Sequence, residues 1–441
     1  MDGPDTDLLS QAVAAFNTGD AARAQTLFRE VLLHDPANAV VHHQLGVLAI
    51  AQHDLRAGER HLSQAVALAP WEPEFHNNLG VALNALGDTA AARQSFETAV
   101  LLNDGFVAAI NNLGAAMEAA GDSLGAIAAY RRALQIDPGY VEARDNLDLA
   151  CAKAAPPWHF PMMADRPRNA AYDAALRRAA PGRRVLDIGA GSGLLAMMAV
   201  RAGALSVDTC EAVAPIAETA RRVIAANGLE DRIALHAKHS EQLQVGVDLK
   251  ERAEVLVTET FASGVVSEAV LPTLEHARRH LLTPDAQVIP CAAWALGYLV
   301  GGEAIEDHLF APRSAGFDLS QFDVFAPSKV GLHLDRIRHD SLSDDFEIFA
   351  FDLTQTLFPG ERRALTVKAT RAGRCVGVAQ WLRLKMDAHT TYENRPHEDA
   401  GSNGWMHVLY RFHEPLQLSP GDDVRLVAGH SRTTMTVALA V

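Results

Sequence analysis

A step of 34 residues runs through the first third of the chain and limits what this part can fold into. Three kinds of position repeat at this step. They are an aspartate (Asp20, Asp54, Asp88, Asp122), a bulky residue (Phe28, Leu62, Phe96, Tyr130) and a Leu-Gly pair (Leu45-Gly46, Leu79-Gly80, Leu113-Gly114). A unit of this length buries its apolar face only against its neighbours. The repeat therefore predicts a solenoid of stacked helix pairs.

The pattern resembles the tetratricopeptide repeat, with small residues where helices cross and proline near the end of the unit. We expect four repeats and a closing helix from about Tyr140 to Lys153, and we assign residues 7–153 to this α-solenoid. An amide precedes each repeated leucine: Gln44, Asn78, Asn112 and Asn146. These amides resemble the asparagine ladder of peptide-binding superhelices, which implies that Asn78, Asn112 and Asn146 bind a peptide main chain. The alternative is that they bridge adjacent repeats.

A strand, a glycine-rich turn and a helix are predicted between residues 184 and 202. The turn has glycine at alternate positions: Gly189, Gly191 and Gly193. Glycines allow a ligand to lie against the main chain. Glu211 follows Gly189 by 22 positions, at the end of the next expected strand, where its carboxylate can accept both hydroxyls of a ribose. The G-x-G-x-G spacing and this acid favour S-adenosylmethionine, which has a ribose and no phosphate, over a dinucleotide.

Strands and helices alternate from Pro181 to Pro290, which predicts a parallel sheet in an α/β Rossmann-like domain. The expected strands span 184–188, 206–211, 233–237 and 254–259. Beyond Pro290 the pattern changes to short strands at 346–353, 363–369, 377–386, 405–412 and 424–428. This second pattern predicts a C-terminal antiparallel β-domain.

Two carboxylates stand at the end of the fourth expected strand. Glu259 ends the strand, and Glu268 follows nine positions later, across a loop. Paired carboxylates are the natural complement of a guanidinium, whose donors form a planar fork. The alternative is one strand-end acid and one solvated acid. Ligands of open α/β sheets bind beyond the carboxyl ends of strands, which favours a shared pocket.

The chain from residue 158 onward resembles the protein arginine methyltransferases, and its sequence motifs are most similar to those of the branch numbered seven and nine in animals. The motifs that carry the resemblance are VLDIGAGSGLLAMMAVRAGA, KHSEQL, LVTETF and LPTLEHARRHLL. The resemblance implies an S-adenosylmethionine-dependent methyltransferase domain over 158–290. It also implies a β-barrel-like substrate domain over 291–441, which can include a dimerisation arm. Because the second catalytic module of this branch is missing, we expect a homodimer.

The resemblance also assigns residues. Glu259 and Glu268 are the expected catalytic pair. The expected cofactor-binding residues are Arg168, Asp187, Gly189, Gly191, Glu211, Ser240 and Glu241. Tyr172 and Trp405 are expected to bind substrate. Gly404 replaces a histidine of the family that pairs with an acid, here Asp165, and Ser263 is expected to line a roomier pocket.

Composition narrows the classes of partner that this protein is expected to bind. The net charge of −15 argues against nucleic-acid binding and favours a cationic partner. The four cysteines form no C-x-x-C pair, which indicates a reducing compartment and no zinc site. We expect His42-His43, His276 and His280 to be solvated helix positions, with no metal ligand among them. The sequence shows neither a signal peptide nor a membrane span, so we expect a cytoplasmic protein without a membrane partner.

These observations predict methyl transfer to arginine side chains of proteins, with the solenoid recruiting the protein or peptide substrate. Two alternatives remain. One is a solenoid scaffold with an inactive methyltransferase fold, which the change at Gly404 keeps open. The other is a methyltransferase that acts on a small molecule, because the cofactor motifs are widely shared.

Overall fold

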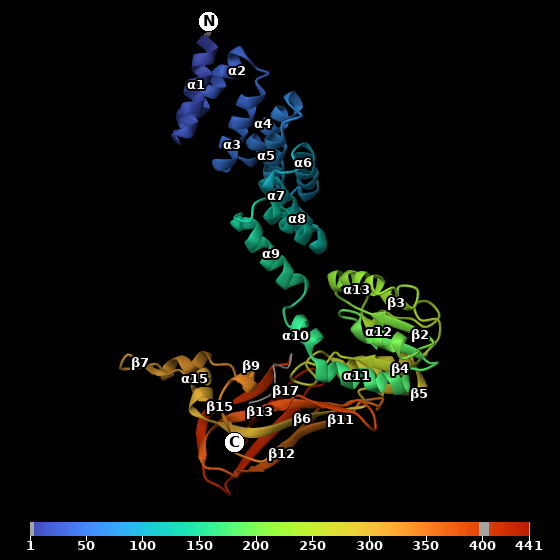
Figure 1. Ribbon diagram of the computed structural model, residues 1–441. Helices are drawn as coiled ribbons and strands as arrows, with labels where there is room; N and C mark the ends of the chain where they lie inside the picture. The colour runs from blue at the N-terminus through green and yellow to red at the C-terminus, as the bar shows by residue number, and fades with distance from the viewer. Residues whose placement is uncertain (1–3, 397–404, 441) are drawn as a thin grey trace. The chain divides into compact units, whose positions relative to one another are not determined.

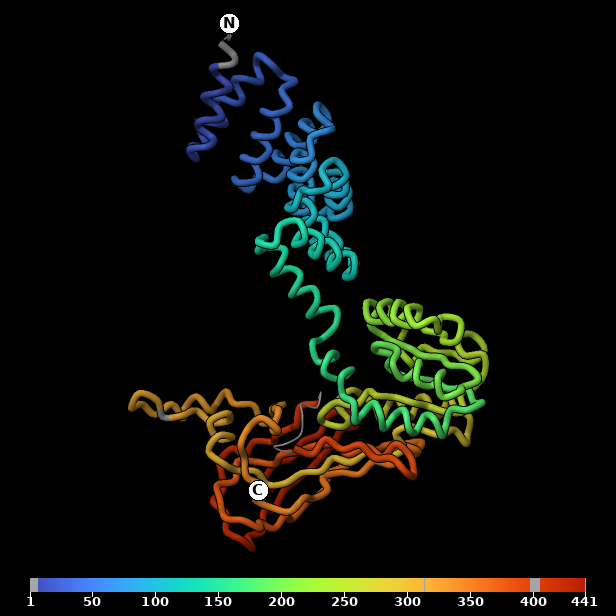
Figure 2. Tube along the Cα trace, in the orientation of Figure 1, coloured from blue at the N-terminus to red at the C-terminus, as the bar shows by residue number. Residues whose placement is uncertain are grey.

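The computed structural model describes residues 4–396 and 405–440, and the chain divides into two compact units (Figure 1). The first unit ends at Pro156 and the second begins at Pro157. The helices of the first unit are α1 (Pro4–Asn17), α2 (Ala21–His34), α3 (Ala39–Ala51), α4 (Leu55–Leu68), α5 (Pro73–Ala85), α6 (Thr89–Leu102), α7 (Val107–Ala119), α8 (Ser123–Ile136) and α9 (Val141–Ala154). Figure 2 shows their trace as successive helix pairs.

The repeated positions have defined roles in this solenoid. The four repeated aspartates cap α2, α4, α6 and α8, because each side chain accepts a hydrogen bond from the backbone three residues later. The repeated glycines let paired helices cross closely. A Cβ at Gly80 would lie 2.6 Å from the ring of Phe96, and one at Gly114 would lie 2.6 Å from the ring of Tyr130. The predicted solenoid of helix pairs is confirmed.

The second unit begins with an α/β layer. Its elements are α10 (His159–Ala164), α11 (Arg166–Ala179), β1 (Arg184–Ile188), α12 (Leu194–Arg201), β2 (Ser206–Cys210), α13 (Ala214–Ala226), β3 (Ile233–His236), η1 (Ser240–Gln242), β4 (Ala253–Thr258), α14 (Val270–His280) and β5 (Leu282–Ile289). The strand order is β3-β2-β1-β4-β5, with every pair parallel. The predicted parallel sheet is confirmed. The chain reverses direction across the sheet between β1 and β4, the place where such sheets bind ligands.

The rest of the unit is antiparallel, as predicted. Its elements are β6 (Ala292–Gly301), α15 (Glu303–Leu309), β7 (Arg313–Ser314), β8 (Phe317–Asp318), η2 (Ser320–Phe325), β9 (Lys329–Leu332), η3 (Leu334–Arg336), β10 (Asp340–Ser341), β11 (Phe346–Asp352), β12 (Glu361–Lys368), β13 (Gly373–Lys385), β14 (Thr391–Glu393), β15 (His407–Leu418), β16 (Asp423–His430) and β17 (Met435–Leu439). The larger sheet has the order β10-β6-β13-β15-β9, with β11 on β6 and β14 on β13, and β12-β16-β17 form a smaller sheet.

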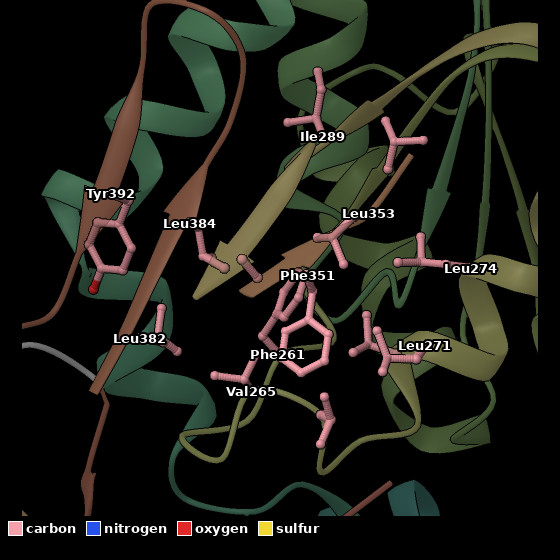
Figure 3. Packing of buried hydrophobic residues seen from close by; sticks show 14 of the residues in the cluster. Phe261, Val265, Leu271, Leu274, Ile289, Phe351, Leu353, Leu382, Leu384 and Tyr392 are labelled. Atoms are coloured by element: carbon pink, nitrogen blue, oxygen red, sulfur yellow. The ribbon is translucent and has the colours of Figure 1, made fainter. Parts of the chain in front are cut away.

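One hydrophobic core runs through both layers of the second unit. Phe261 and Leu271, which follow β4, belong to the same buried cluster as Phe351, Leu382 and Leu384 of the antiparallel strands (Figure 3). The loop after β4 is therefore packed between the two layers. Among the described residues, no helix has the length and apolar character that a bilayer span requires.

Candidate active site

The glycine turn after β1 forms one wall of the site. Gly189, Gly191 and Gly193 have φ values of +86°, +51° and +80°, a region that glycine adopts without strain. A Cβ added to Gly191 would meet nothing within 4 Å, so the space in front of this residue is open. A Cβ on Gly189 would lie 2.7 Å from Cγ2 of Thr260. Glycine at this position therefore lets the loop after β4 approach the turn.

Two acids lie beside this turn. Glu211 accepts hydrogen bonds from the backbone nitrogens of Gly191 at 3.1 Å and Val213 at 2.9 Å. Asp187 is fully buried and accepts one from Thr209 Oγ1 at 2.9 Å, while its Oδ1 has no partner among the described residues. Burial raises the pKa of Asp187 to about 7. Both acids thus lie at the carboxyl ends of the neighbouring strands β1 and β2.

Ser240 and Glu241 lie on η1, which packs against α14. Ser240 is buried and Glu241 is exposed. His276 of α14 is half-buried rather than solvated, and no described group bonds to its buried Nδ1. Burial lowers the pKa of His276, whose electrostatic neighbours include Glu241. The expectation of a solvated His276 is therefore wrong, because α14 turns this face toward η1.

Arg168 and Glu259 form a largely buried ion pair. Arg168 Nη1 lies 3.1 Å from Glu259 Oε2. Asp165 caps α11 by accepting a hydrogen bond from the backbone nitrogen of Arg168 at 3.0 Å, which fixes the start of that helix. The other oxygen of Glu259 is buried and has no hydrogen bond within the described chain. Burial raises the pKa of Glu259 to about 8, and the charge of Arg168 opposes this change.

Glu268 lies in the turn before α14, close enough for its charge to raise the pKa of Glu259 further. The residue is exposed overall, yet desolvation raises the pKa of its own carboxyl, and His159 of α10 acts in the opposite direction. The structure thus brings Glu259 and Glu268 to one place. Two neighbouring carboxylates, one of them with a buried oxygen that lacks a donor among the described residues, fit a cationic ligand with several N–H groups.

Tyr172 is one helical turn after Arg168 and is completely buried. Its hydroxyl donates to the carbonyl of Thr258 at 3.0 Å, so it anchors the last residue of β4. Trp405 is also buried and stands just before β15. Gly404 lies outside the described residues.

The partner of Asp165 is Tyr392 of β14, whose hydroxyl donates to Asp165 Oδ2 at 2.7 Å. Both side chains are buried. No sequence signal predicts this role of Tyr392, because the two residues are 227 positions apart and no motif links them. Figure 3 shows the ring of Tyr392, with its hydroxyl oxygen in red.

A buried amide holds the loop that joins the two glutamates. Gln380 of β13 donates from Nε2 to the carbonyl of Ser263 at 2.7 Å, and its Oε1 accepts from the hydroxyl of Tyr410 at 2.9 Å. Ser263 is half-buried. The larger antiparallel sheet therefore positions the loop between Glu259 and Glu268.

In the solenoid, the predicted amides bond to the preceding repeat. Asn112 Nδ2 donates to Asn77 Oδ1 at 2.9 Å, and Asn146 Nδ2 donates to Asn111 Oδ1 at 3.0 Å. These bonds match the alternative in which amides bridge adjacent repeats. Within residues 4–396 and 405–440, no hydrogen bond uses Oδ1 of Asn112 or Asn146.

His43 takes the corresponding place in the second repeat. Its Nε2 accepts a hydrogen bond from Asn78 Nδ2 at 2.7 Å, and its ring stacks on Phe75 at 4.5 Å. The residue is 3% exposed, and burial lowers its pKa. The expectation that His43 is solvated is therefore wrong, because the inner helix faces of adjacent repeats meet at this position. No group of three or more His, Cys, Asp or Glu side chains in the described chain is arranged to hold a metal ion.

Comparison with known proteins agrees with this arrangement. The tetratricopeptide repeat family matches residues 43–105 and 85–141, and the family described as ribosomal protein L11 methyltransferase (PrmA) matches residues 171–281. An arginine N(omega)-methyltransferase of Streptomyces achromogenes subsp. streptozoticus is 39% identical over 287 residues, which cover 64% of this chain and 79% of that protein. The chain belongs to the arginine methyltransferase family.

Other relatives cover the chain less completely. Protein arginine N-methyltransferase 7 of Aedes aegypti is 34% identical over 320 residues, and the matched part covers 61% of this chain and 46% of that protein. The chain thus spans less than half the length of that relative. The Trypanosoma brucei PRMT1 enzyme-prozyme complex with AdoHcy contains a chain with the same fold, at a TM-score of 0.55 and 20% identity, which covers 64% of this chain and 92% of that one.

Proposed function

We propose that this protein transfers a methyl group from S-adenosylmethionine to a guanidinium nitrogen of arginine. The observation that carries the proposal is the pair Glu259 and Glu268, in which a buried oxygen of Glu259 has no donor within the described chain. A guanidinium offers five N–H donors in a fixed plane and stays charged at neutral pH. It matches this pair of carboxylates in charge and in hydrogen-bonding capacity.

The residues beside the glycine turn fit the cofactor. The open space at Gly191 admits a ligand against the main chain, and Glu211 lies at its edge as an acceptor for a ribose. Asp187 adds a buried oxygen that has no hydrogen-bond partner among the described residues, and Ser240 and Glu241 of η1 are the further polar contacts that we propose for the cofactor. When bound, S-adenosylmethionine supplies an electrophilic methyl group on a sulfonium.

The two glutamates have a positioning and an electrostatic role in this proposal. They draw the positive charge of the guanidinium toward the nitrogens that they bind, and they aim the remaining nitrogen at the methyl group. Arg168 holds Glu259 through the ion pair, and Tyr172 holds the end of β4. Orientation of this kind contributes several kcal/mol to lowering a barrier, on the order of 7 kcal/mol in well-aligned cases.

The proposed substrate is an arginine side chain of a protein, recruited by the solenoid. Asn112 and Asn146 support this role, because each uses its amide nitrogen between repeats and keeps its oxygen for another donor. Asn78 is the proposed third member, although its amide is engaged on both sides by His43 and Asn77. In the antiparallel β-domain, we propose that Trp405 contacts the substrate.

We propose a homodimer in the cytoplasm. The segment from α15 to η2 presents exposed apolar residues that a second copy can cover: Phe317, Phe322, Val324 and Phe325, each at least 70% exposed. The four cysteines are free thiols, as a reducing compartment maintains.

A second candidate substrate is arginine itself. The Streptomyces relative is named for arginine without mention of a protein, and this supports the small-molecule alternative. The same glutamate pair serves both substrates, so the distinction lies in what surrounds the guanidinium.

The test is a transfer assay with labelled S-adenosylmethionine on arginine and on arginine-containing, glycine-rich peptides, with products resolved by mass spectrometry. We expect methylated arginine from the wild type, and a loss on the order of 100-fold or more in Glu259→Gln and in Glu268→Gln. Calorimetry on both variants should still detect cofactor binding. Cofactor binding without any product in the wild type would favour the inactive scaffold.

A further inference from the structure

A lysine approaches the loop between the glutamates from the antiparallel sheet. Lys329 is the first residue of β9, which pairs with β15 so that Lys329 lies opposite Tyr410. Its ammonium nitrogen lies 5.6 Å from the centroid of the Tyr410 ring. A Cβ built on Gly264 would lie 3.0 Å from the same nitrogen. The ammonium therefore contacts the loop that carries Glu259 and Glu268.

Among the described residues, this ammonium has no carboxylate partner. Lysines that form ion pairs in the described chain include Lys153, Lys238 and Lys368. Lys329 forms none within residues 4–396 and 405–440, and neither glutamate of the loop pairs with it. Desolvation by the neighbouring loop and ring lowers the pKa of Lys329. Lys329 is an exposed residue, so a carboxylate in solution can reach this partly desolvated ammonium and offset its lost solvation.

The hydroxyl of Tyr410, whose ring the ammonium faces, is already engaged in a hydrogen bond. Gln380 bonds to the carbonyl of Ser263 and to the hydroxyl of Tyr410. The nearby Arg411 pairs with Asp323 at 3.3 Å. Arg411, the residue after Tyr410 in β15, is thus paired with an acid, whereas Lys329 forms no ion pair within the described residues.

Resting on the function proposed above, we propose that Lys329 binds a carboxylate of the arginine-bearing substrate. The glutamates take the guanidinium, and Lys329 takes the opposite charge at the other end of the same ligand. An extended arginine spans roughly 7 Å between its guanidinium and its α-carboxylate by standard bond lengths. The carboxylate has two sources with the same chemistry: the α-carboxylate of free arginine, or an acidic side chain beside the target arginine of a protein.

The experiment compares ligands that differ only in the carboxylate. Calorimetry on the full-length protein measures the Kd of L-arginine and of agmatine, which has the same guanidinium and no carboxylate. A second pair of probes is a glycine-rich arginine peptide with Asp beside the arginine and the same peptide with Asn. The variants are Lys329→Met, Lys329→Arg and, as a matched control, Lys250→Met, because Lys250 is exposed and lies before β4.

We expect Lys329→Met to weaken the carboxylate-bearing probe about tenfold and to leave its neutral counterpart unchanged. Lys329→Arg should retain most of the affinity, and Lys250→Met should behave as wild type. Loss confined to L-arginine identifies the α-carboxylate as the ligand, and loss confined to the Asp peptide identifies a flanking acid. Equal Kd values for wild type and Lys329→Met on all four probes overturn the proposal. Calorimetry measures binding without turnover. If the wild type is inactive but still binds the carboxylate-bearing probes more tightly through Lys329, the proposed activity is refuted and the proposed role of Lys329 is not.

Discussion

Arg168 Nη1 lies 3.1 Å from Oε2 of Glu259, and the two side chains are only 6% and 17% exposed. Arg168→Met leaves the carboxyl of Glu259 buried without its cation. Above about pH 8, where Glu259 is ionised, breaking a buried pair in this way costs about 3 kcal/mol of unfolding free energy. Denaturant unfolding measures the loss. Arg177→Met is the matched control on α11, because its pair with Asp173 is exposed and should change stability by less than about 0.5 kcal/mol. The double variant Arg168→Met with Glu259→Gln should recover part of the loss, and strict additivity would contradict the coupling.

The raised pKa of Glu259 makes both stability and activity depend on pH. Because its folded pKa of about 8 exceeds the ordinary value of about 4.3, the fold favours the protonated carboxyl. The stability gained is present below about pH 4 and is lost as the pH rises through about 8. Relative to Glu259→Gln, the wild type should therefore lose Tm between about pH 5 and pH 9. The kcat/KM of the wild type should rise over the same range, since substrate binding needs the ionised carboxylate. A pH-independent difference in Tm would argue against this assignment.

Tyr392→Phe removes the hydroxyl that satisfies Asp165. The buried carboxylate loses one donor, which costs about 1–3 kcal/mol. Thermal unfolding reports the stability change. Because Asp165 also caps α11, the kcat of methyl transfer should fall together with stability. Tyr140→Phe is the control, since its hydroxyl makes no hydrogen bond among the described residues, and it should leave both measurements unchanged.

Gly80→Ala tests the packing of the solenoid. Alanine gains about 1 kcal/mol over glycine inside a helix, but here its Cβ would stand 2.6 Å from the ring of Phe96. We expect a net loss of about 1–3 kcal/mol, measured by the thermal unfolding of the full chain. Gly105→Ala is the control, because the nearest atom to its added Cβ is 3.5 Å away. A stabilised Gly80→Ala variant would refute the close crossing of these helices.

The parts of the fold that were predicted are those specified by local patterns. The 34-residue step gave the helix pairs because each repeated aspartate caps its own helix. The first strand, 184–188, agrees with the prediction; β2 and β3 end one residue earlier than predicted, and β4 both begins and ends one residue earlier. The antiparallel strands were placed less well: β6 was missed, and β15 begins at His407 rather than Trp405. Strands buried on both faces lack the alternation that marks a strand in sequence.

The site was predicted in its motif residues and missed in its long-range contacts. Glu259 and Glu268 stand nine positions apart, so one loop brings them together. Tyr392 meets Asp165, and Gln380 meets Ser263, across separations of 227 and 117 positions. His43 has no local signal of burial, because a histidine on an inner helix face is hidden only when the next repeat packs on it. Contacts of these kinds depend on tertiary packing and not on a spacing.

The amide of Gln380 has a consequence for protein engineering. The Ser263 carbonyl accepts a hydrogen bond from a strand that starts more than a hundred positions later in the chain. A chimera that exchanges everything after residue 290 for the matching part of a relative would keep its own glutamates. The loop between them would then depend on a strand of the relative for the hydrogen bond to Ser263. The loop from 259 to 268 and strand β13 therefore form one structural unit. Transferring substrate specificity from one family member to another requires that both segments are exchanged together.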